Sequence, residues 1–459
     1  MKLSKVQITN FRCFPSLSIS LQDDINVFVG INGAGKTTIL DAIAVALYDI
    51  VAANGGGGKR QRANQNVNLR PSDLHVTPGA DPIEGRSDFV QVSCGASQFY
   101  PLPSFPVKAP TGAENLIEWT DHIQHTPPND FSYETYESKK LSPIYDYFGA
   151  LWTEIRKNPT ALIPLPVVAY YRADRRLRDM PSLGDIFKVA LERDGAYVEA
   201  LNAGADYQGV CQWFYLRENS ELREKQQIRK DSEFEYPDLR AVRHAIKRCI
   251  ENVEDIFFRD NSLAVSLKEP GGAPKVLLLE QLSDGYRNLL AVILDFARRL
   301  AQANPQFENP LEAPGILLID EIELHLHPRW QQTVIPRLRE TFPNTQLNVT
   351  THSPQVLTTI HSAKIQIIRD QNLYSAPAGT YGAESQRMLV DVLKAPARPP
   401  ENEAVDELNA LFRLISDGHL NEAQSELQNL VTKRGFSEPA LLEAETIIKN
   451  RLWEKELGI

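Results

Sequence analysis

Residues 30–37 combine glycines with a lysine and a hydroxyl side chain at a spacing that suits phosphate binding. They read Gly-Ile-Asn-Gly-Ala-Gly-Lys-Thr and match the pattern G-x4-G-K-[ST] at every required position. Glycines allow backbone N–H groups to turn inward and approach phosphates closely. Lys36 can then reach the β- and γ-phosphates, and Thr37 can present its hydroxyl to Mg²⁺. The sequence therefore predicts that ATP and Mg²⁺ bind at the following residues: Asn32, Gly33, Ala34, Gly35, Lys36, Thr37 and Thr38.

The segments on either side of this loop have the patterns of a buried strand and a helix. Residues 25–29 are mostly apolar, and residues 37–47 are rich in helix-forming side chains. A helix that begins directly after the loop adds the partial positive charge of its N-terminus to the phosphate site. The alternative, a glycine turn before an ordinary helix, leaves the agreement of strand, loop and helix unexplained.

A second chemical pattern is an apolar strand that ends in two carboxylates. Residues 315–319 are glycine, isoleucine and leucine, and Asp320 and Glu321 follow them directly. Such a strand brings Asp320 to the carboxyl-terminal edge of a sheet, where it can hold the water shell of Mg²⁺. Glu321 can then orient and polarise the attacking water. Either carboxylate alone could be a surface residue, but their joint position after a buried strand favours a catalytic role.

A third pattern lies between the phosphate loop and the two carboxylates in the sequence. It is formed by residues 281–287, which read Gln-Leu-Ser-Asp-Gly-Tyr-Arg and precede an apolar helix. Here the sequence resembles the ABC-type ATPases, whose signature, commonly LSGGQ, has the same place in the chain. The resemblance implies that Ser283 and Gly285 bind the γ-phosphate of ATP held by the opposite subunit. Asp284 replaces the usual glycine and Tyr286 the glutamine, so slow hydrolysis or a nucleotide-sensing site remains open. A purely local role for Ser283 as a helix cap is the alternative.

Two segments with histidines follow the carboxylates. Residues 323–328 read Glu-Leu-His-Leu-His-Pro and could suggest a metal site, but the resemblance implies the dimer-contact loop, or D-loop, of ABC ATPases. His352 follows a strand-like segment and matches the switch histidine, which contacts the γ-phosphate; a structural histidine is the alternative. The glutamine loop of the family has no single match, because Gln91, Gln98 and residues 171–175 all compete.

The distribution of apolar residues predicts an α/β fold with a helical lobe and a C-terminal helical tail. The resemblance implies that its α/β part is an ABC-type P-loop ATPase head, with a mixed sheet and flanking helices. The first part comprises residues 1–52 for the N-lobe of the head, 53–160 for a partly mobile insertion, and 161–182 for a core strand and basic run. The second part comprises residues 183–260 for the helical lobe, 261–393 for the C-lobe, and 394–459 for the tail.

The tail follows a proline-rich hinge at residues 394–400. Its apolar residues recur at helical spacing, and breaks at residues 417–419 and 434–439 separate three helices. The tail is either a small cap on the head or a docking platform for a nuclease or another subunit.

Length, composition and charge are those of an ordinary globular protein. The 459 residues carry a net charge of −10, which argues against a protein that coats nucleic acid. No apolar run approaches the ~18 residues of a membrane helix, and the N-terminus opens a strand rather than a signal peptide. The four cysteines are scattered along the chain, as in a reducing compartment. We therefore expect a cytoplasmic protein without membrane contact.

Three basic clusters could contact the phosphates of nucleic acid. They lie at residues 59–62, 172–178 and 240–248. A solvated surface is the alternative for each cluster.

The opening residues 8–14 and the phosphate loop resemble the RecF/SMC-like branch of ABC ATPases rather than membrane transporters. Together with residues 282–287, 319–328 and 351–354, they resemble compact ATPases of anti-phage systems, most of all the PtuA family of Septu and some retron systems. That family works with an HNH nuclease of the PtuB type. The resemblance implies an ATPase that forms a head-to-tail homodimer or higher homo-oligomer and regulates a separate HNH nuclease subunit.

DNA, or a retron reverse transcriptase with its msDNA, is a further candidate partner. Residues 401–459 are too few for another catalytic domain of ordinary size, so we expect no nuclease domain here. Two other functions remain open. One is a RecF-like DNA repair ATPase whose main ligand is DNA, and the other, suggested by Asp284, is a nucleotide-gated scaffold with little turnover.

Overall fold

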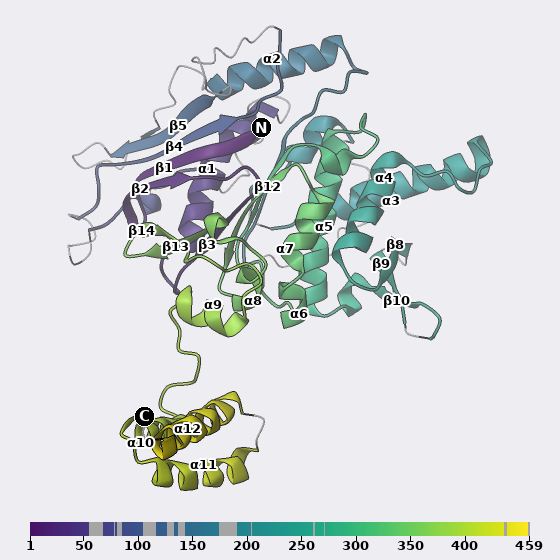
Figure 1. The fold of residues 1–459 in the computed structure, drawn as a ribbon. Helices are drawn as coiled ribbons and strands as arrows, with labels where there is room; N and C mark the ends of the chain where they lie inside the picture. Colours follow the sequence, from purple (N-terminus) through teal and green to yellow (C-terminus); the bar gives the residue numbers. More distant parts are fainter. Residues whose placement is uncertain are drawn as a thin grey trace. The chain divides into compact units, whose positions relative to one another are not determined.

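The chain divides into two compact units, Met1–Leu393 and Lys394–Ile459 (Figure 1). The computed structural model describes residues 1–54, 68–77, 79, 85–103, 116–125, 133–135, 143–173, 191–202, 204–259, 262–269, 271–435 and 438–457. The strands of the first unit are β1 Lys2–Phe11, β2 Phe14–Ser20, β3 Ile25–Val29, β4 Phe89–Ser97, β5 Ile117–His125, β6 Tyr133–Thr135, β7 Val167–Tyr171, β8 Val253–Arg259, β9 Ser262–Leu267, β10 Lys275–Leu278, β11 Gly315–Ile319, β12 Thr345–Thr351, β13 Ile365–Arg369 and β14 Asn372–Ser375. Its helices are α1 Lys36–Asn54, α2 Pro143–Lys157, α3 Tyr207–Arg223, α4 Pro237–Cys249, α5 Asp284–Ala303, α6 Pro328–Gln331, α7 Val334–Thr341, α8 Pro354–Leu357 and α9 Ser385–Asp391.

A mixed sheet in the order β14-β13-β3-β12-β11-β7 forms the centre of the first unit. The neighbours from β13 to β7 run parallel, and only β14 pairs antiparallel at the edge. Strands β3, β7, β11 and β12 are buried along their whole length. In β3, β7 and β11 this burial agrees with mostly apolar sequences, whereas β12 reads Thr-Gln-Leu-Asn-Val-Thr-Thr and buries polar side chains. Because these strands are parallel, their carboxyl ends meet at one edge of the sheet, where ligands bind in such folds.

The second sheet has the order β2-β1-β4-β5-β6, and its pairs are antiparallel. Strands β1 and β2 form an antiparallel hairpin that precedes the phosphate loop, and β1 is the strand expected at the N-terminus. The range 53–160 was expected to be an insertion, and its described parts correct that interpretation. Strand β4 pairs with β1 on one side and β5 on the other, so this range supplies integral strands of the sheet. The glycine-rich residues 55–58 lie outside the described residues.

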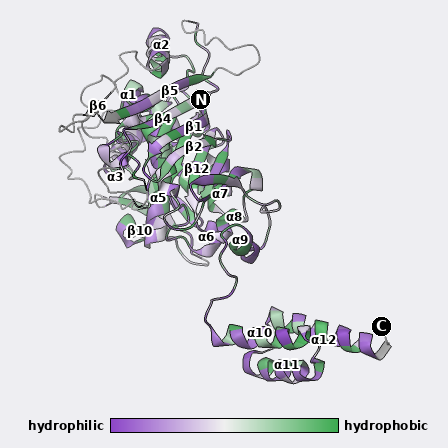
Figure 2. Ribbon diagram, turned by 90° about the vertical axis from the view of Figure 1, so that its left-hand side faces the viewer, coloured by the Kyte–Doolittle hydropathy of each residue, from purple (hydrophilic) through white to green (hydrophobic). Residues whose placement is uncertain are grey.

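Helix α1 packs against strands of both sheets and connects the phosphate loop to the core. No run was expected to approach the length of a membrane helix, but α1 is long and apolar enough to cross a membrane. Most of its residues are buried inside the protein, as in a core helix. Figure 2 shows hydrophobic residues on strands of the head. The phosphate loop is therefore continued by a helix that is buried in the core.

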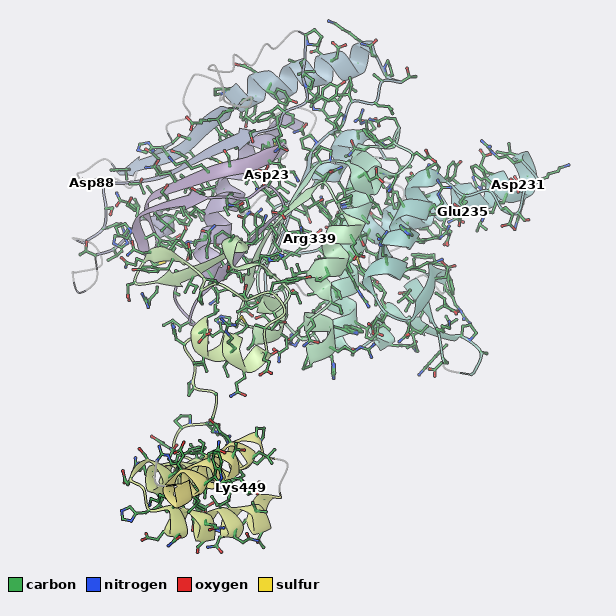
Figure 3. All side chains as sticks on the ribbon, viewed as in Figure 1. Asp23, Asp88, Asp231, Glu235, Arg339 and Lys449 are labelled. Atoms are coloured by element: carbon green, nitrogen blue, oxygen red, sulfur yellow. The ribbon has the colours of Figure 1, made fainter. Side chains whose placement is uncertain are left out.

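A projecting helical hairpin and a small sheet form the lobe between the two halves of the head. Helices α3 and α4 make the hairpin, and Figure 3 shows Asp231 near its outer end. Residues 183–260 were expected to be helical, but the last of them form strand β8. That strand pairs antiparallel with β9, with a register shift between Val253 and Asp255.

The second unit is a bundle of three helices with its own core. The helices are α10 Glu403–Ser416, α11 Leu420–Arg434 and α12 Pro439–Leu457. Breaks between them occur where the glycine, proline and charged residues were expected to end each helix. The buried residues of this core are Leu408, Leu411, Ile415, Ala423, Leu427, Leu430, Leu441, Ala444 and Ile448. Of the apolar residues expected in it, Leu442 is 43% exposed.

Candidate nucleotide-binding site

The phosphate loop joins the carboxyl end of β3 to the first turn of α1, as the sequence predicts. Gly33 and Gly35 have positive φ angles of 80° and 100°, which side chains with a Cβ rarely adopt. A Cβ on Gly35 would also lie 2.6 Å from the ring of Phe14. Asn32, Gly33 and Thr37 are exposed, whereas Ala34, Gly35 and Thr38 are half-buried. The loop thus presents its backbone to solvent while its base is packed against the β1–β2 turn.

Lys36 lies inside this loop. Its Nζ donates hydrogen bonds to the carbonyl oxygens of Gly30 and Ile31, both at 3.1 Å. Burial lowers the pKa of Lys36, and the nearby carboxylates of Asp320, Glu321 and Glu323 oppose that shift. A cation surrounded in this way is positioned to exchange carbonyl contacts for phosphate oxygens.

Asp320 and Glu321 follow β11 at the same edge of the sheet. The Oγ1 of Thr37 donates a hydrogen bond to Oδ2 of Asp320 at 2.8 Å, so the two expected Mg²⁺ ligands are adjacent. Oγ1 of Thr350, on the neighbouring strand β12, donates to Oδ1 of Asp320 at 2.5 Å and accepts the N–H of Glu321 at 2.7 Å. Glu321 has a positive φ of 47°, which turns the chain sharply after the strand. Thr350 therefore holds the side chain of Asp320 and the backbone of Glu321.

His352 follows β12 and joins this group. Its backbone N–H donates to Oε1 of Glu323 at 2.5 Å. Burial lowers the pKa of His352, and the Lys36 cation lowers it further, against the nearby carboxylates. The imidazole is therefore neutral at pH 7 and can accept or donate a hydrogen bond. The structure thus brings Lys36, Thr37, Asp320, Glu321 and His352 together.

Ser283 and Gly285 lie at the start of α5, where they contact a different loop. Ser283 occupies the N-cap position, but its side chain makes no capping hydrogen bond, and it is exposed. Gly285 is buried, and a Cβ there would lie 2.2 Å from the carbonyl oxygen of His325. The carboxylate of Asp284 forms an ion pair with Arg287, one turn further along the helix. The signature segment therefore leaves Ser283 available and has a cation beside the unusual aspartate.

The other patterns noted in the sequence are distributed over the head. Among the described residues, no group of three or more His, Cys, Asp and Glu side chains could hold a metal ion, so His325 and His327 form no transition-metal site. The side-chain amide of Gln91 donates a hydrogen bond to the hydroxyl of Ser93 within β4, and that of Gln98 donates one to the carboxylate of Asp23. The third candidate for the glutamine loop, residues 171–175, begins at the last residue of β7. The carbonyl oxygen of Tyr171 accepts a hydrogen bond from the backbone N–H of Asp320 at 2.8 Å.

Arginine and lysine side chains in two of the three basic clusters form ion pairs with acidic side chains. In α4, Arg243, Lys247 and Arg248 form ion pairs with acidic side chains, which reduces the charge free for a polyanion. In the second cluster, Arg172 pairs with Asp41. Residues 59–62 and 174–178 lie outside the described residues.

Sequence reasoning missed several residues that support this site. Thr350 and Glu323 bond directly to the residues named above, and a threonine in a fully buried strand was the available signal for the first. Asp41, in α1, accepts hydrogen bonds from Tyr170 at 2.6 Å and from Arg12 at 2.5 Å. Arg12, in turn, bonds to Asp73 at 2.8 Å. These ion pairs connect the β1–β2 turn, α1 and the end of β7 around the base of the phosphate loop.

Comparisons with known proteins agree with this geometry. Residues 213–358 match a family described as "AAA domain, putative AbiEii toxin, Type IV TA system", and residues 1–78 match the "AAA ATPase domain" family. The chain is 29% identical to a probable ATPase of retron Ec83 from Escherichia coli, over 99% of this chain and 88% of that one. It is 26% identical to a probable ATPase of retron Vc95 from Vibrio cholerae, over 81% and 74%.

Two further similarities are more limited. A segment covering 34% of this chain is 31% identical to the Septu protein PtuA of Bacillus mycoides, of which it covers 22%. A solved SMC head bound to the C-winged helix domain of ScpA aligns with a TM-score of 0.44 at 18% identity, over 82% of this chain and 98% of that one. The match to the "AAA ATPase domain" family covers β3 and the phosphate loop, and the match to the other AAA family covers β11 and β12. The chain is therefore similar to AAA-type ATPases at both parts of the candidate site, and to the probable ATPases of two retrons over most of its length.

Proposed function

We propose that the chain binds and hydrolyses ATP at the edge formed by β3, β11 and β12. The single observation that carries this proposal is the 2.8 Å hydrogen bond between the Thr37 hydroxyl and the Asp320 carboxylate. It joins two motifs separated by 283 residues, and Lys36 lies beside them. A structural role alone gives no reason for a buried lysine, three carboxylates and a neutral histidine to meet at one exposed loop.

The residues present also fit Mg²⁺. Proteins bind this ion through one or two oxygen ligands, together with substrate phosphates and water, and Thr37 and Asp320 supply such oxygens. When bound, the ion would neutralise charge on the β- and γ-phosphates. Thr350 keeps the Asp320 carboxylate oriented toward Thr37 through its own hydrogen bond.

The remaining steps belong to side chains of this chain. Lys36 would exchange its two carbonyl contacts for β- and γ-phosphate oxygens, and the loop N–H groups would bind the phosphates. Glu321 would accept a hydrogen bond from the attacking water and direct it in line with the γ-phosphate. His352 would contact the γ-phosphate. Catalysis of this kind depends on positioning and electrostatics rather than on covalent chemistry.

The second half of each site would come from another copy of the chain. Ser283 is exposed and has no capping bond, so its hydroxyl is available for a γ-phosphate on a facing subunit. Ile31, in the phosphate loop, is 71% exposed, so a facing subunit could contact the loop there. We therefore propose a head-to-tail homodimer as the active unit. The pair of Asp284 with Arg287 offsets a negative charge that would otherwise face the phosphate.

The cellular role proposed here follows from the retron and Septu relatives. We propose that this ATPase acts in anti-phage defence, in the cytoplasm, and that its nucleotide state controls a separate HNH nuclease. The three-helix unit would dock that nuclease, because it has a core of its own and is joined to the head by residues 394–402 without helix or strand.

Copurification tests the partner. The chain is expressed with its neighbouring genes, and the proteins that copurify are identified by mass. We expect a stoichiometric small nuclease that is lost when residues 403–459 are deleted, while the shortened chain still binds ATP. ATP-dependent, salt-sensitive DNA binding without any protein partner would instead support the repair ATPase.

A further inference from the structure

Glu323 is a carboxylate at the nucleotide edge for which the ATPase motifs give no role. It lies two residues after Glu321, in the loop between β11 and α6, which was expected only to contact a second subunit. Its Oε1 accepts the backbone N–H of His352 at 2.5 Å. Glu323 therefore holds the backbone of the residue whose imidazole would contact the γ-phosphate.

The second oxygen of Glu323 is buried without a hydrogen bond. Among the described residues, its Oε2 has no hydrogen-bond partner and almost no solvent exposure. A buried acceptor in this state lacks the solvation that a carboxylate normally needs. Its negative charge acts on both Lys36 and His352, for which it raises the pKa against the effect of burial. The carboxylate is thus directed into the site rather than toward solvent.

A second connection joins the same two loops. Gln331 donates through Nε2 to the carbonyl oxygen of Leu326 at 2.9 Å, and its Oε1 accepts the hydroxyl of Ser353 at 2.7 Å. Ser353 in turn caps α8 by accepting the N–H of Val356 at 3.2 Å. The loop after β11 and the loop after β12 therefore form one hydrogen-bonded unit. Of its two connections, only Glu323 reaches His352 itself.

We propose that Glu323 is a positioning residue for ATP hydrolysis. Its carboxylate oxygen accepts the backbone N–H of His352 and thereby holds His352 in place. This inference rests on the proposed ATPase function and goes beyond its motifs. Without the acceptor, the N–H of His352 would lose its partner, and the loop could move the imidazole relative to the γ-phosphate. A displacement of about 1 Å can reduce a rate by about 10²-fold, so a backbone contact can control turnover.

A double-mutant cycle in the full chain tests the proposal. Glu323→Ala, His352→Ala and the double variant are compared for kcat and KM of ATP hydrolysis. We expect Glu323→Ala to lower kcat by about 10- to 100-fold with KM changed less than about threefold, because binding depends on the phosphate loop. The double variant should be no slower than His352→Ala, since both changes remove the same interaction.

Glu323→Gln separates the acceptor from the charge. Its amide oxygen can still accept the N–H of His352, so we expect kcat within about threefold of the parent chain. Glu308→Ala, at an exposed glutamate of the same head, is the matched control and should leave kcat and KM unchanged.

Three results would overturn the positioning role. The first is a kcat of Glu323→Ala equal to that of the parent chain. The second is a kcat of the double variant that is lowered by the product of the two single effects. The third is a kcat of Glu323→Gln as low as that of Glu323→Ala. The parent chain and Lys36→Ala are measured first. Absence of Lys36-dependent turnover in the parent would refute the proposed ATPase itself, whereas normal parent turnover with any of the three results refutes only the role of Glu323.

Discussion

At the scale of single residues, the site depends on backbone positions as much as on side chains. Gly285 shows this most clearly, because its Cα faces the carbonyl oxygen of His325 and leaves no room for a methyl group. The signature segment and the loop after β11 are consequently packed against each other through their backbones. Ser283 can reach a facing subunit only from the position that this contact defines.

Gly285→Ala should therefore impair turnover without removing any functional group. The added Cβ would lie 2.2 Å from the carbonyl oxygen of His325, so one of the two loops must move. We expect kcat to fall at least about tenfold while ATP affinity of the isolated chain changes little. Gly149→Ala is the matched control, because a Cβ at Gly149 in α2 meets nothing within 4 Å. Equal rates for Gly285→Ala and the parent would show that the packing of the signature is unimportant.

The sequence predicted the chemical residues of the site better than their support. Lys36, Thr37, Asp320, Glu321 and His352 could be named because a strand, a sharp turn and a helix leave a strong local pattern. Thr350, Asp41 and Glu323 could not, since each acts through a contact with a residue far away in the chain. Periodicity identified β3, β11 and β12 but missed β8, whose pairing with β9 outweighed its helical neighbourhood.

At the scale of elements, a buried ion cluster joins α5 to the edge of the central sheet. Asp295 pairs with Arg298 at 2.6 Å and Arg299 at 2.9 Å, and it accepts the hydroxyl of Tyr171 at 2.8 Å. Arg299 also donates to the carbonyl oxygens of Ala196 and Val198, both at 2.7 Å. The helix that begins with the signature is thus fixed to β7 and to the segment before α3.

Asp295→Asn should destabilise the head strongly, because it removes the carboxylate shared by the buried guanidinium groups of Arg298 and Arg299, and only Arg298 keeps a second carboxylate among its described partners, Asp206 at 3.4 Å. Removal of one partner from a buried ion pair costs about 3–5 kcal/mol. The free energy of unfolding in urea checks this value. Tyr171→Phe, which removes only one hydrogen bond to the same carboxylate, should cost about 1 kcal/mol. Similar stabilities for Asp295→Asn and the parent would mean that the cluster does not hold α5.

Because of the same cluster, the free energy of unfolding of the head should depend on pH in the acidic range. Burial alone would raise the pKa of Asp295, but Arg299 and Arg298 outweigh it and lower the pKa from 3.8 to about 2. The folded state then binds fewer protons than the unfolded state between these values, so the stabilisation is complete above about pH 4 and is lost as the pH falls toward 2. Unfolding measured from pH 7 to pH 2 should show this loss in the parent and a smaller one in Asp295→Asn. Parallel pH profiles for the two proteins would contradict it.

At the scale of the whole molecule, the proposed head-to-tail dimer makes each ATP site a product of two chains. Lys36→Ala removes the phosphate contact of one half, and Ser283→Arg blocks the other. A mixed dimer of the two variants retains one complete site, whereas each variant alone retains none. With equal amounts and random pairing, about half of the dimers are mixed, and about a quarter of the parent activity should return. Activity no greater than the sum of the separate variants would rule out shared sites.

The central claim is that Glu321 directs water at the site built from Lys36, Thr37 and Asp320, and one comparison of ATP turnover tests it most directly. The parent chain and Glu321→Gln are assayed side by side with Mg²⁺, and bound ATP is measured in both. We expect Glu321→Gln to retain ATP and to favour the dimer while its kcat falls by about 10²-fold or more, as for the loss of a residue needed only in the transition state. Hydrolysis by Glu321→Gln at the parent rate would contradict the account.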